Sequence, residues 1–466
     1  SVTVPTAVRA NDMLDAENIV EQSQEQENNE TLENVKSIDQ ETNQEKNTLE
    51  NQEKNTLENQ EDTNETAEVV AAQAIEQPEV ETQSVEKAIG TTIYVDGYTS
   101  GNDSNSGTSR DQPVKTLKHA VDLAGQNGTV IVLDTVIINE DTVLDNNVTI
   151  KRGGACASGM ISTYDHDLTI NHATIDGNKQ EYPKSSQLIS INGYSKININ
   201  EGAKLCNNGD VAIQQLQSNR RNAPIVTMNG GEICDNDCTN NYYQATIIMF
   251  QSVGELYING GSIHDNKGGA IEVGVPTFKM TGGKIYNNDN SGESFGAIWL
   301  TLAATKGFIS GGEIYGNKSY NGGAISMAGS TELTISGNTS IHDNTVTGDG
   351  SAIYMSYKSS LKIEDGVQII GNKGVGDDSG GAIGLSESAS LTIGKATISN
   401  NSAQYGGGIA SYTSGTVTLN GTILTNNTAS LTSNNWGNGG AISINKTGTL
   451  NINDATIENN QALRGG

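Results

Sequence analysis

The chain has 466 residues, with 55 Asp and Glu against 27 Lys and Arg, for a net charge of -28 at pH 7. Such an excess of acid argues against nucleic acid or an anionic membrane as partner, because phosphate groups would be repelled. No run approaches the roughly 18 apolar residues of a membrane span. Four cysteines are too few for a disulfide scaffold in a chain of this length.

Residues 1–90 form an acidic, low-complexity segment with 22 Asp and Glu, 5 Lys and Arg and no aromatic residue. Such a composition cannot bury enough apolar surface to offset its chain entropy, so we predict a disordered tail, with a single polar helix as the alternative. Residues 1–10 end in Val-Arg-Ala, the small-residue pattern of a signal-peptidase site, and are interpreted as the remnant of an export signal.

Residues 91–128 are expected to begin the folded part with a strand and a helix. In the segment that starts at Pro113, four apolar residues fall on one helical face. A helix with one apolar face can cover the open strand edges of a first coil. We therefore predict an N-terminal capping helix, whose buried face is Leu117, Ala120, Val121 and Ala124.

Residues 129–466 carry an internal repeat in which an apolar residue is followed three positions later by asparagine. A repeat of about 28 residues is the signature of a solenoid. Short alternating segments before the turn and a Gly-Gly-Ala-Ile element after it predict about three strands per coil. We expect each asparagine to adopt the left-handed backbone and to join a hydrogen-bonded ladder. The predicted ladder is Asn178, Asn208, Asn236, Asn266, Asn288, Asn317, Asn344, Asn372, Asn401, Asn427 and Asn460.

The fold class that follows is all-β, a parallel β-helix with a capping helix and a disordered acidic tail. Stacked coils pair each strand with the strands above and below, and the constant chain direction makes the pairing parallel. Residues 459–466 match residues 400–407 in pattern, so we expect the chain to stop inside a corner, as a fragment of a longer protein truncated at its C-terminus.

Two groups of motifs resemble known families. Ile-Tyr-Val-Asp-Gly at 93–97, the Gly- and Asn-rich stretch 101–108 and Pro-Val-Lys-Thr-Leu at 113–117 resemble the opening of secreted bacterial β-helix proteins of the pectin-lyase-like superfamily. The Gly-Gly-Ala-Ile and Ile-x-x-Asn pair is similar to the repeats of chlamydial polymorphic outer membrane proteins. These resemblances cover about residues 91–466 and imply a right-handed sense, export, and an extracellular or cell-surface location in a bacterium.

No recognisable catalytic constellation is present, and no cofactor is predicted. An enzyme on this scaffold would place carboxylates on outward positions of adjacent coils, and glycoside hydrolysis needs at least two of them. The densest titratable group is Asp165, His166 and Asp167, near His172 and Asp176. These are weak catalytic candidates, and solvated loop charges are the simpler interpretation. We therefore lean against an enzyme.

The position after the apolar residue of each turn is expected to point outward and to form a column. The spacing places Cys206 and Cys234 on adjacent coils, where either a disulfide or two reduced thiols is acceptable. A Cys3His metal site with Cys238 and His264 is sterically conceivable. We predict no metal, because the repeat alone accounts for the spacing. The column continues through Tyr286, Tyr315 and His342.

Outward aromatic residues are candidates for ligand binding. Tyr286 and Tyr315 fall on neighbouring coils, and Trp299 and Tyr354 follow the Ala-Ile corner about two coils apart. Aromatic rings on a flat β-face can stack on sugar rings, because they combine an apolar body with a polar edge. Stabilisation between like side chains of a ladder is the alternative.

The leading functional hypothesis is an exported bacterial cell-surface protein, adhesin-like, that binds glycans or host proteins along a rod. One alternative is a polysaccharide lyase or glycoside hydrolase of pectin-lyase-like fold, with its site in residues 150–250 or beyond the end of the chain. A purely structural surface spacer is another. The fold by itself does not decide between them.

Overall fold

The computed structural model describes residues 90–217, 223–301, 305–376, 379–429, 437–446 and 448–465. All of them belong to one compact unit, Ser84–Gly466. The predicted tail and export-signal remnant lie outside the described residues. The unit is a right-handed parallel β-helix with about 28 residues per turn, so the predicted fold class is confirmed.

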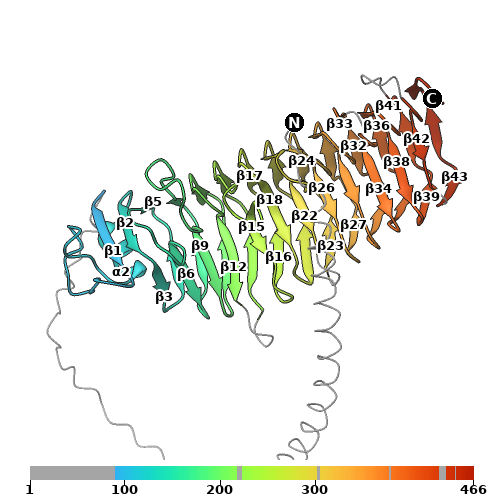
Figure 1. Cartoon of the computed structure of the whole chain (residues 1–466). Coiled ribbons are helices and arrows are strands. Elements are labelled where there is room, and N and C mark those ends of the chain that lie inside the picture. The colour runs from blue at the N-terminus through green and yellow to red at the C-terminus, as the bar shows by residue number, and fades with distance from the viewer. Residues whose placement is uncertain are drawn as a thin grey trace, which may run out of the picture. The chain divides into compact units, whose positions relative to one another are not determined.

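Each coil contributes one strand to each of three long parallel sheets, and the sheets run along the column as Figure 1 shows. Sheet 1 has 14 strands, and the asparagine corner follows its strands. Its strands are β1 (Thr92–Asp96), β2 (Thr129–Asp134), β5 (Val148–Arg152), β8 (Ala173–Asp176), β11 (Lys204–Cys206), β14 (Glu232–Cys234), β17 (Ser262–His264), β20 (Lys284–Tyr286), β24 (Glu313–Tyr315), β28 (Ser340–His342), β32 (Gln368–Ile370), β36 (Thr397–Ser399), β40 (Ile423–Thr425) and β44 (Thr456–Glu458).

Sheet 2 has 12 strands and precedes sheet 1 in each coil. Its strands carry the alternating apolar pattern that the sequence predicts. They are β4 (Thr142–Leu144), β7 (Leu168–Ile170), β10 (Lys196–Ile199), β13 (Ile225–Met228), β16 (Glu255–Ile258), β19 (Thr277–Met280), β23 (Lys306–Ile309), β27 (Glu332–Ile335), β31 (Ser360–Ile363), β35 (Ser390–Ile393), β39 (Thr416–Asn420) and β43 (Thr449–Asn453).

Sheet 3 has 12 strands and holds the Ala-Ile element of each coil. Its outward positions are the ones that the candidate site uses below. The strands are β3 (Val136–Ile138), β6 (Ile161–Tyr164), β9 (Ile189–Asn192), β12 (Ile213–Gln217), β15 (Ala245–Met249), β18 (Gly269–Val273), β22 (Ile298–Leu300), β26 (Ile325–Met327), β30 (Ile353–Met355), β34 (Ile383–Glu387), β38 (Ile409–Thr413) and β42 (Ile442–Ile444).

A fourth sheet of seven two-residue strands runs along the corner between sheets 1 and 3, and the sequence pattern did not indicate it. Such short strands carry no visible alternation, which is why the pattern cannot reveal them. They are β21 (Asp289–Asn290), β25 (Lys318–Ser319), β29 (Thr345–Val346), β33 (Lys373–Gly374), β37 (Ser402–Ala403), β41 (Thr428–Ala429) and β45 (Gln461–Ala462).

The interior is a continuous apolar column built from the inward residues of the three long sheets. Corresponding residues pair in register from coil to coil, as Ile263, Ile285 and Ile314 do in sheet 1. Each of these side chains is 0% exposed. Because like residues lie directly above one another, each coil covers the apolar surface that the next coil would otherwise expose to water.

The capping helix forms where the sequence predicts it. Helix α2 (Leu117–Ala124) begins after Thr116, whose hydroxyl accepts the backbone N–H of His119, and ends at Gly125 with a φ of 70°. These are a typical N-cap and a left-handed glycine stop. Its buried residues are those of the predicted apolar face, Leu117, Ala120, Val121 and Ala124. The helix lies beside β1 and β2 at the start of the column.

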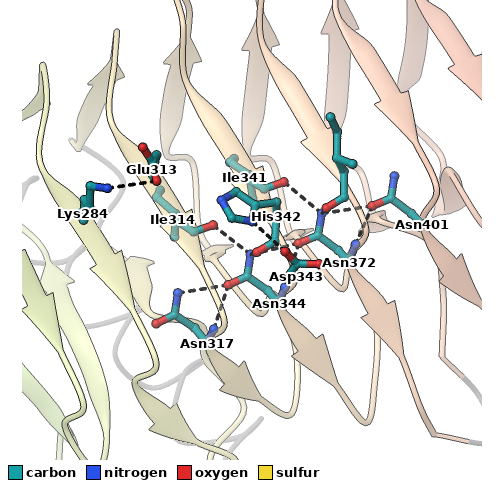
Figure 2. Close-up of polar contacts among 11 residues, drawn as sticks. Lys284, Glu313, Ile314, Asn317, Ile341, His342, Asp343, Asn344, Asn372 and Asn401 are labelled. Carbon is teal, nitrogen blue, oxygen red and sulfur yellow. Dashed lines mark hydrogen bonds and ion pairs between the residues drawn. The ribbon is translucent and has the colours of Figure 1, made fainter.

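The corner after sheet 1 is held by a buried asparagine ladder, part of which is shown in Figure 2. The backbone N–H of Asn344 donates to Oδ1 of Asn372 at 3.1 Å, and its Nδ2 donates to the same oxygen at 2.9 Å. Nδ2 also donates to the carbonyl of Ile314 in the preceding coil at 3.0 Å. Each internal amide therefore ties its own coil to both neighbours.

The left-handed backbone lies one position earlier than predicted. In the corner of Asn344 the residue with positive φ is Asp343, at 54°, and Asn400 plays the same part before Asn401. Of the predicted ladder only Asn178 has a positive φ. The residue with positive φ turns the chain at the corner, so that the side chain of the following asparagine points inward. There its amide is shielded from water and bonds to the neighbouring coils.

Asn178 does not join the ladder, which begins at Asn208. Gly177 occupies the place beneath Asn208, and a Cβ added to it would lie 2.4 Å from Oδ1 of that asparagine. The buried Arg152 donates from Nη2 to the same oxygen at 3.3 Å. Asn178 instead donates from Nδ2 to Glu181 at 2.9 Å. A guanidinium therefore ends the amide column at its N-terminal side.

We expect Asn344→Ala to lower the free energy of unfolding by ~3 kcal/mol, because it leaves several buried groups unpaired, including the backbone N–H of Asn317. Urea denaturation measures the change. The matched control is Asn259→Ala, which removes an exposed amide that bonds to Asn229 on the surface and should change stability by less than about 0.5 kcal/mol. Equal losses in both variants would contradict a special role for the buried ladder.

Candidate functional site

One column of outward side chains on sheet 3 combines aromatic, apolar and carboxyl groups. Ile248 of β15 pairs in register with Glu272 of β18, which pairs with Trp299 of β22. The column continues through Ser326 to Tyr354. Adjacent rungs of a parallel sheet lie about 4.8 Å apart, so neighbouring members of the column are in reach of one another.

Glu272 is buried although its position points away from the core. Its exposure is 0%, and neither carboxyl oxygen has a hydrogen-bond partner among the described residues. Burial raises the pKa of this carboxyl well above its usual value, because the charged form loses its hydration. Burial therefore favours the protonated carboxyl more than in an exposed glutamate, and its oxygens have hydrogen-bonding capacity that the described part of the chain does not use.

Trp299 lies on the next rung and also has an unused polar atom. Its indole Nε1 is buried and lacks a hydrogen-bond partner within the described residues. Phe295 stacks on the indole ring, with centroids 3.4 Å apart and planes at 9°. The carbonyl of Phe295 accepts a hydrogen bond from Nδ2 of Asn290 at 2.8 Å, which fixes the covering segment.

An apolar cluster separate from the core covers the neighbouring coil. It consists of Val211, Ala245 and Ile248, with Tyr243 and Phe250 packed against them. Rings of Tyr243 and Phe250 lie 5.1 Å apart. Burial, and secondarily the nearby Glu272, raises the pKa of Tyr243. Satellite clusters of this kind form under covering loops, and here the cluster adjoins the buried carboxyl.

Together, Glu272, Trp299, Phe295, Tyr243 and Phe250 define what we call the sheet 3 patch. A carboxyl and an indole N–H without partners next to apolar rings match the usual composition of ligand sites, which are mostly apolar with a few placed polar groups. Buried polar atoms without partners are costly and rare in native proteins. The patch therefore combines apolar rings with hydrogen-bonding capacity that is closed to solvent in this structure.

Tyr354, the second aromatic predicted on this column, lies two rungs beyond Trp299, with Ser326 between them. Its hydroxyl lies 3.1 Å from Oγ of Ser386, and burial raises its pKa. The two predicted rings thus share a face of the rod but do not touch.

Tyr286 and Tyr315 lie in a stacked column of four rings that His264 and His342 complete. Successive centroids are 4.6, 4.9 and 4.8 Å apart, and the planes agree within 5°. Both faces of the Tyr286 and Tyr315 rings pack against neighbouring rings, so that only their edges are left to contact solvent. This arrangement favours ladder stabilisation over stacking on a sugar. Figure 2 shows the last ring of the column, His342, beside Asp343.

Cys206 and Cys234 lie on adjacent rungs, as the spacing predicts, and pair in register. Both are free thiols, so the disulfide stays a prediction. Burial raises the pKa of Cys206 to about 12 and that of Cys234 to about 11. Cys238 is elsewhere, with its Sγ 3.8 Å from the hydroxyl of Thr246. The Cys3His arrangement is therefore not assembled.

The acidic group at 165–167 connects coils. Asp165 accepts the backbone N–H of Tyr194 at 2.7 Å, and Asp167 accepts that of Lys196 at 2.8 Å. Nδ1 of His166 lies 3.6 Å from a carboxylate oxygen of Asp141, and both side chains are exposed. Carboxylates used in this way hold corners together, and the contacts give no sign of a catalytic pair.

A groove of about 410 Å³ runs across the corner between sheets 2 and 1. Its charged lining is internally paired, since Nζ of Lys362 lies 2.7 Å from Oε1 of Glu364. The groove is also lined by Asp365, Thr392 and Asn420. The described groove lacks the buried, unpartnered groups that distinguish the sheet 3 patch.

Sequence reasoning missed Glu272 and a second, exposed asparagine ladder. In that ladder Asn200 donates to Asn171 at 2.9 Å and Asn229 to Asn200 at 3.0 Å. An Asn after the last apolar residue of successive sheet 2 strands is the signal that would have revealed it. For Glu272 the signal is chemical, because it is the one carboxylate in the described outward slot after the Ile of the Ala-Ile element.

Comparisons with protein-family models, with curated proteins and with solved structures find no match to this chain. Among the described residues, no helix is both long and apolar enough to cross a membrane.

We expect Glu272→Gln to remove a pH dependence of stability. The folded pKa lies above the unfolded value, so the wild type is relatively most stable at low pH and loses stability as pH rises through the interval between the two values. As pH rises, the free energy of unfolding of the wild type should fall relative to that of Glu272→Gln by up to about 1.4 kcal/mol per pH unit. Urea unfolding at pH 5 and at pH 8 measures it.

Glu332→Gln is the matched control, because that carboxylate is exposed and lies 3.7 Å from Nζ of Lys306. Its unfolding curves should follow those of the wild type at both pH values. If Glu272→Gln also runs parallel to the wild type, the buried neutral carboxyl is contradicted.

Proposed function

We propose that this protein is an exported, adhesin-like protein of a bacterial cell surface that binds glycans through the sheet 3 patch of its β-helix rod. The observation that supports the proposal is the adjacency of Glu272 and Trp299, whose buried polar atoms have no partners in the described part of the chain. A glycan that displaced the segment covering Trp299 would offer those atoms hydroxyl groups and the aromatic rings an apolar sugar face.

The composition of the patch favours a sugar over a purely apolar ligand. A neutral carboxyl can both donate and accept hydrogen bonds, and the indole N–H donates one. A sugar ring has hydroxyl groups of both kinds at its rim and C–H groups on its faces. The stacked pair of Phe295 and Trp299 supplies the apolar side of such a complex.

The rod itself suits a long or repetitive partner. Its coils repeat at the spacing of parallel strands, and the surface next to the patch stays regular over many coils. Tyr242, 75% exposed, stands at the edge of the patch with its ring 5.1 Å from that of Tyr243. It extends the aromatic surface beyond the buried pair and provides a contact that a ligand reaches first.

Export and a surface location rest on the sequence. Val-Arg-Ala at 8–10 and the resemblance of residues 91–128 to secreted β-helix proteins support both. A host protein with an apolar, hydroxyl-rich surface is the alternative partner for the same patch.

A polysaccharide-cleaving enzyme is the second candidate, and Glu272 is the observation that favours it. A carboxyl with a raised pKa is suited to act as a general acid. Hydrolysis needs a second carboxylate, and Glu293 on the segment that covers Trp299 would be that group. Nε2 of Gln244 donates to it at 2.8 Å.

We expect Trp299→Ala in the full chain to weaken glycan binding at least tenfold, about 1.4 kcal/mol, because the ring and the N–H donor are both lost. A glycan array identifies the ligand, and calorimetric titration with that glycan measures the affinity. Tyr315→Ala, which removes an aromatic ring from the stacked column outside the patch, should bind as the wild type does. Equal weakening in both variants would point away from the patch.

The enzyme alternative predicts that a panel of acidic polysaccharides yields unsaturated or reducing ends with the wild type and at least 100-fold fewer with Glu272→Gln. Binding without any new ends across the panel would support the adhesin-like function instead.

A further inference from the structure

A second cluster of chemically reactive side chains lies where the ring column meets the cysteines on sheet 1. Glu232 and Cys234 belong to β14, and His264 belongs to the next strand, β17, where it pairs in register with Cys234. One ligand atom from each of the three residues lies within 4.8 Å of those of the other two. A carboxylate, a thiol and an imidazole are the three ligand types that zinc uses in proteins.

His264 has one ring nitrogen without a partner among the described residues. Its Nδ1 lies 2.7 Å from Oδ2 of Asp265, so Nδ1 carries the proton and Nε2 keeps its lone pair. Nε2 is buried and has no hydrogen-bond partner among the described residues. Stacking on Tyr286 at 4.6 Å fixes the plane of the ring. A carboxylate behind the histidine is the usual outer partner of a metal-bound imidazole.

Cys234 supplies the soft ligand. Its side chain is 1% exposed and is not part of a disulfide. Cys206 lies on the rung on the far side of Cys234, away from His264.

Glu232 supplies an oxygen ligand from the surface. Its side chain is half-exposed, and one oxygen lies 3.4 Å from Nζ of Lys204. An exposed ion pair of this kind contributes little stability, so a carboxylate oxygen can leave it at small cost. Ligand atoms around a tetrahedral zinc lie roughly 3.5 Å apart, and rotation of the Glu232 side chain can close the remaining distance.

The opposite end of the ring column provides an internal comparison. His342 stacks on Tyr315 at 4.8 Å, and its Nδ1 lies 2.8 Å from Asp343, so it repeats the arrangement of His264. Its neighbour on the next rung is Ile370, not a thiol. The ring column therefore explains the histidine and its aspartate at both ends, but it does not explain a thiol and a carboxylate around only one of them.

We propose that Glu232, Cys234 and His264 form a binding site for a divalent transition-metal ion of the zinc class. The ion would bind the thiolate sulfur, Nε2 of the imidazole and one carboxylate oxygen, which leaves a fourth position for water. Binding forms the metal–sulfur bond and releases the thiol proton to solvent, so charge and atoms balance without an oxidant. Three protein ligands with one open position are the arrangement of reactive rather than purely structural zinc sites.

The test is titration of the full chain with Zn²⁺, kept reduced, with calorimetry as the readout. We expect one tight equivalent in the wild type. Cys234→Ser and His264→Ala should each weaken it at least 100-fold, because a direct ligand is lost. Asp265→Asn should weaken it on the order of 10- to 100-fold, as loss of an outer partner does. Saturating Zn²⁺ should raise the melting temperature of the wild type and should have little effect on those of Cys234→Ser and His264→Ala.

The matched controls are His342→Ala and Cys238→Ser, which remove the same residue types outside the cluster. Both should bind one equivalent with the affinity of the wild type, and circular dichroism checks that every variant is folded. The proposal is overturned if the wild type binds no stoichiometric Zn²⁺, or if His342→Ala weakens binding as much as His264→Ala does. Failure of glycan binding would leave this result unaffected, since the sheet 3 patch is on a different sheet.

Discussion

The fold depends on one repeated interaction, the hydrogen-bonded column of buried asparagine amides at the corner after sheet 1. A coil of about 28 residues can slide against its neighbour, because its apolar interior offers little directional preference. An amide that donates to one specific oxygen above it and one specific carbonyl below it removes that freedom. Each buried amide group would be costly if it were unpaired, and so any other register is penalised.

Because the register is fixed in this way, equivalent positions of successive coils line up as columns of side chains on the outside of the rod. The column that joins Cys234, His264 and Tyr286 and the one that joins Ile248, Glu272 and Trp299 both follow from it. Chemistry that needs several groups therefore arises from single residues contributed at coil spacing. Both candidate sites are products of stacking and not of any local motif, which is why no short motif marks them.

Much of this was accessible from the sequence, and the failures have physical causes. Period-two segments and the Ile-x-x-Asn turn predicted the coil, and the apolar face of residues 117–124 predicted the cap. The corner at Asn178 was misplaced, because a glycine and an arginine there replace the amide contacts and no periodicity reveals such an exchange. The left-handed residue lies one position before the predicted one, and the prediction missed it because asparagine, which tolerates this backbone, occurs at both positions of the turn.

Glu272 escaped prediction for another reason. Alternation correctly assigns it to the outside of the strand, and an outside glutamate is normally hydrated. Its burial is produced by neighbouring rings of coils with irregular corners, whose conformation the repeat does not encode. The same limit applies to the metal-ligand cluster, where residue spacing gave the neighbours but not the direction of the imidazole nitrogens.

The amide column also has a direction, because each member gives its backbone N–H to the following coil and takes one from the coil before. At the first member, Asn208, the guanidinium of Arg152 donates the hydrogen bond that Oδ1 would otherwise accept from a preceding coil. From Asn236 to Asn460 the junctions repeat the same contacts, so a whole turn in that range can be excised or duplicated and the flanking turns will meet through the same contact. Recombination between repeats can thus alter the length of the rod in whole turns, whereas the start of the column, where Arg152 takes the place of an amide, has no equivalent junction among the described turns.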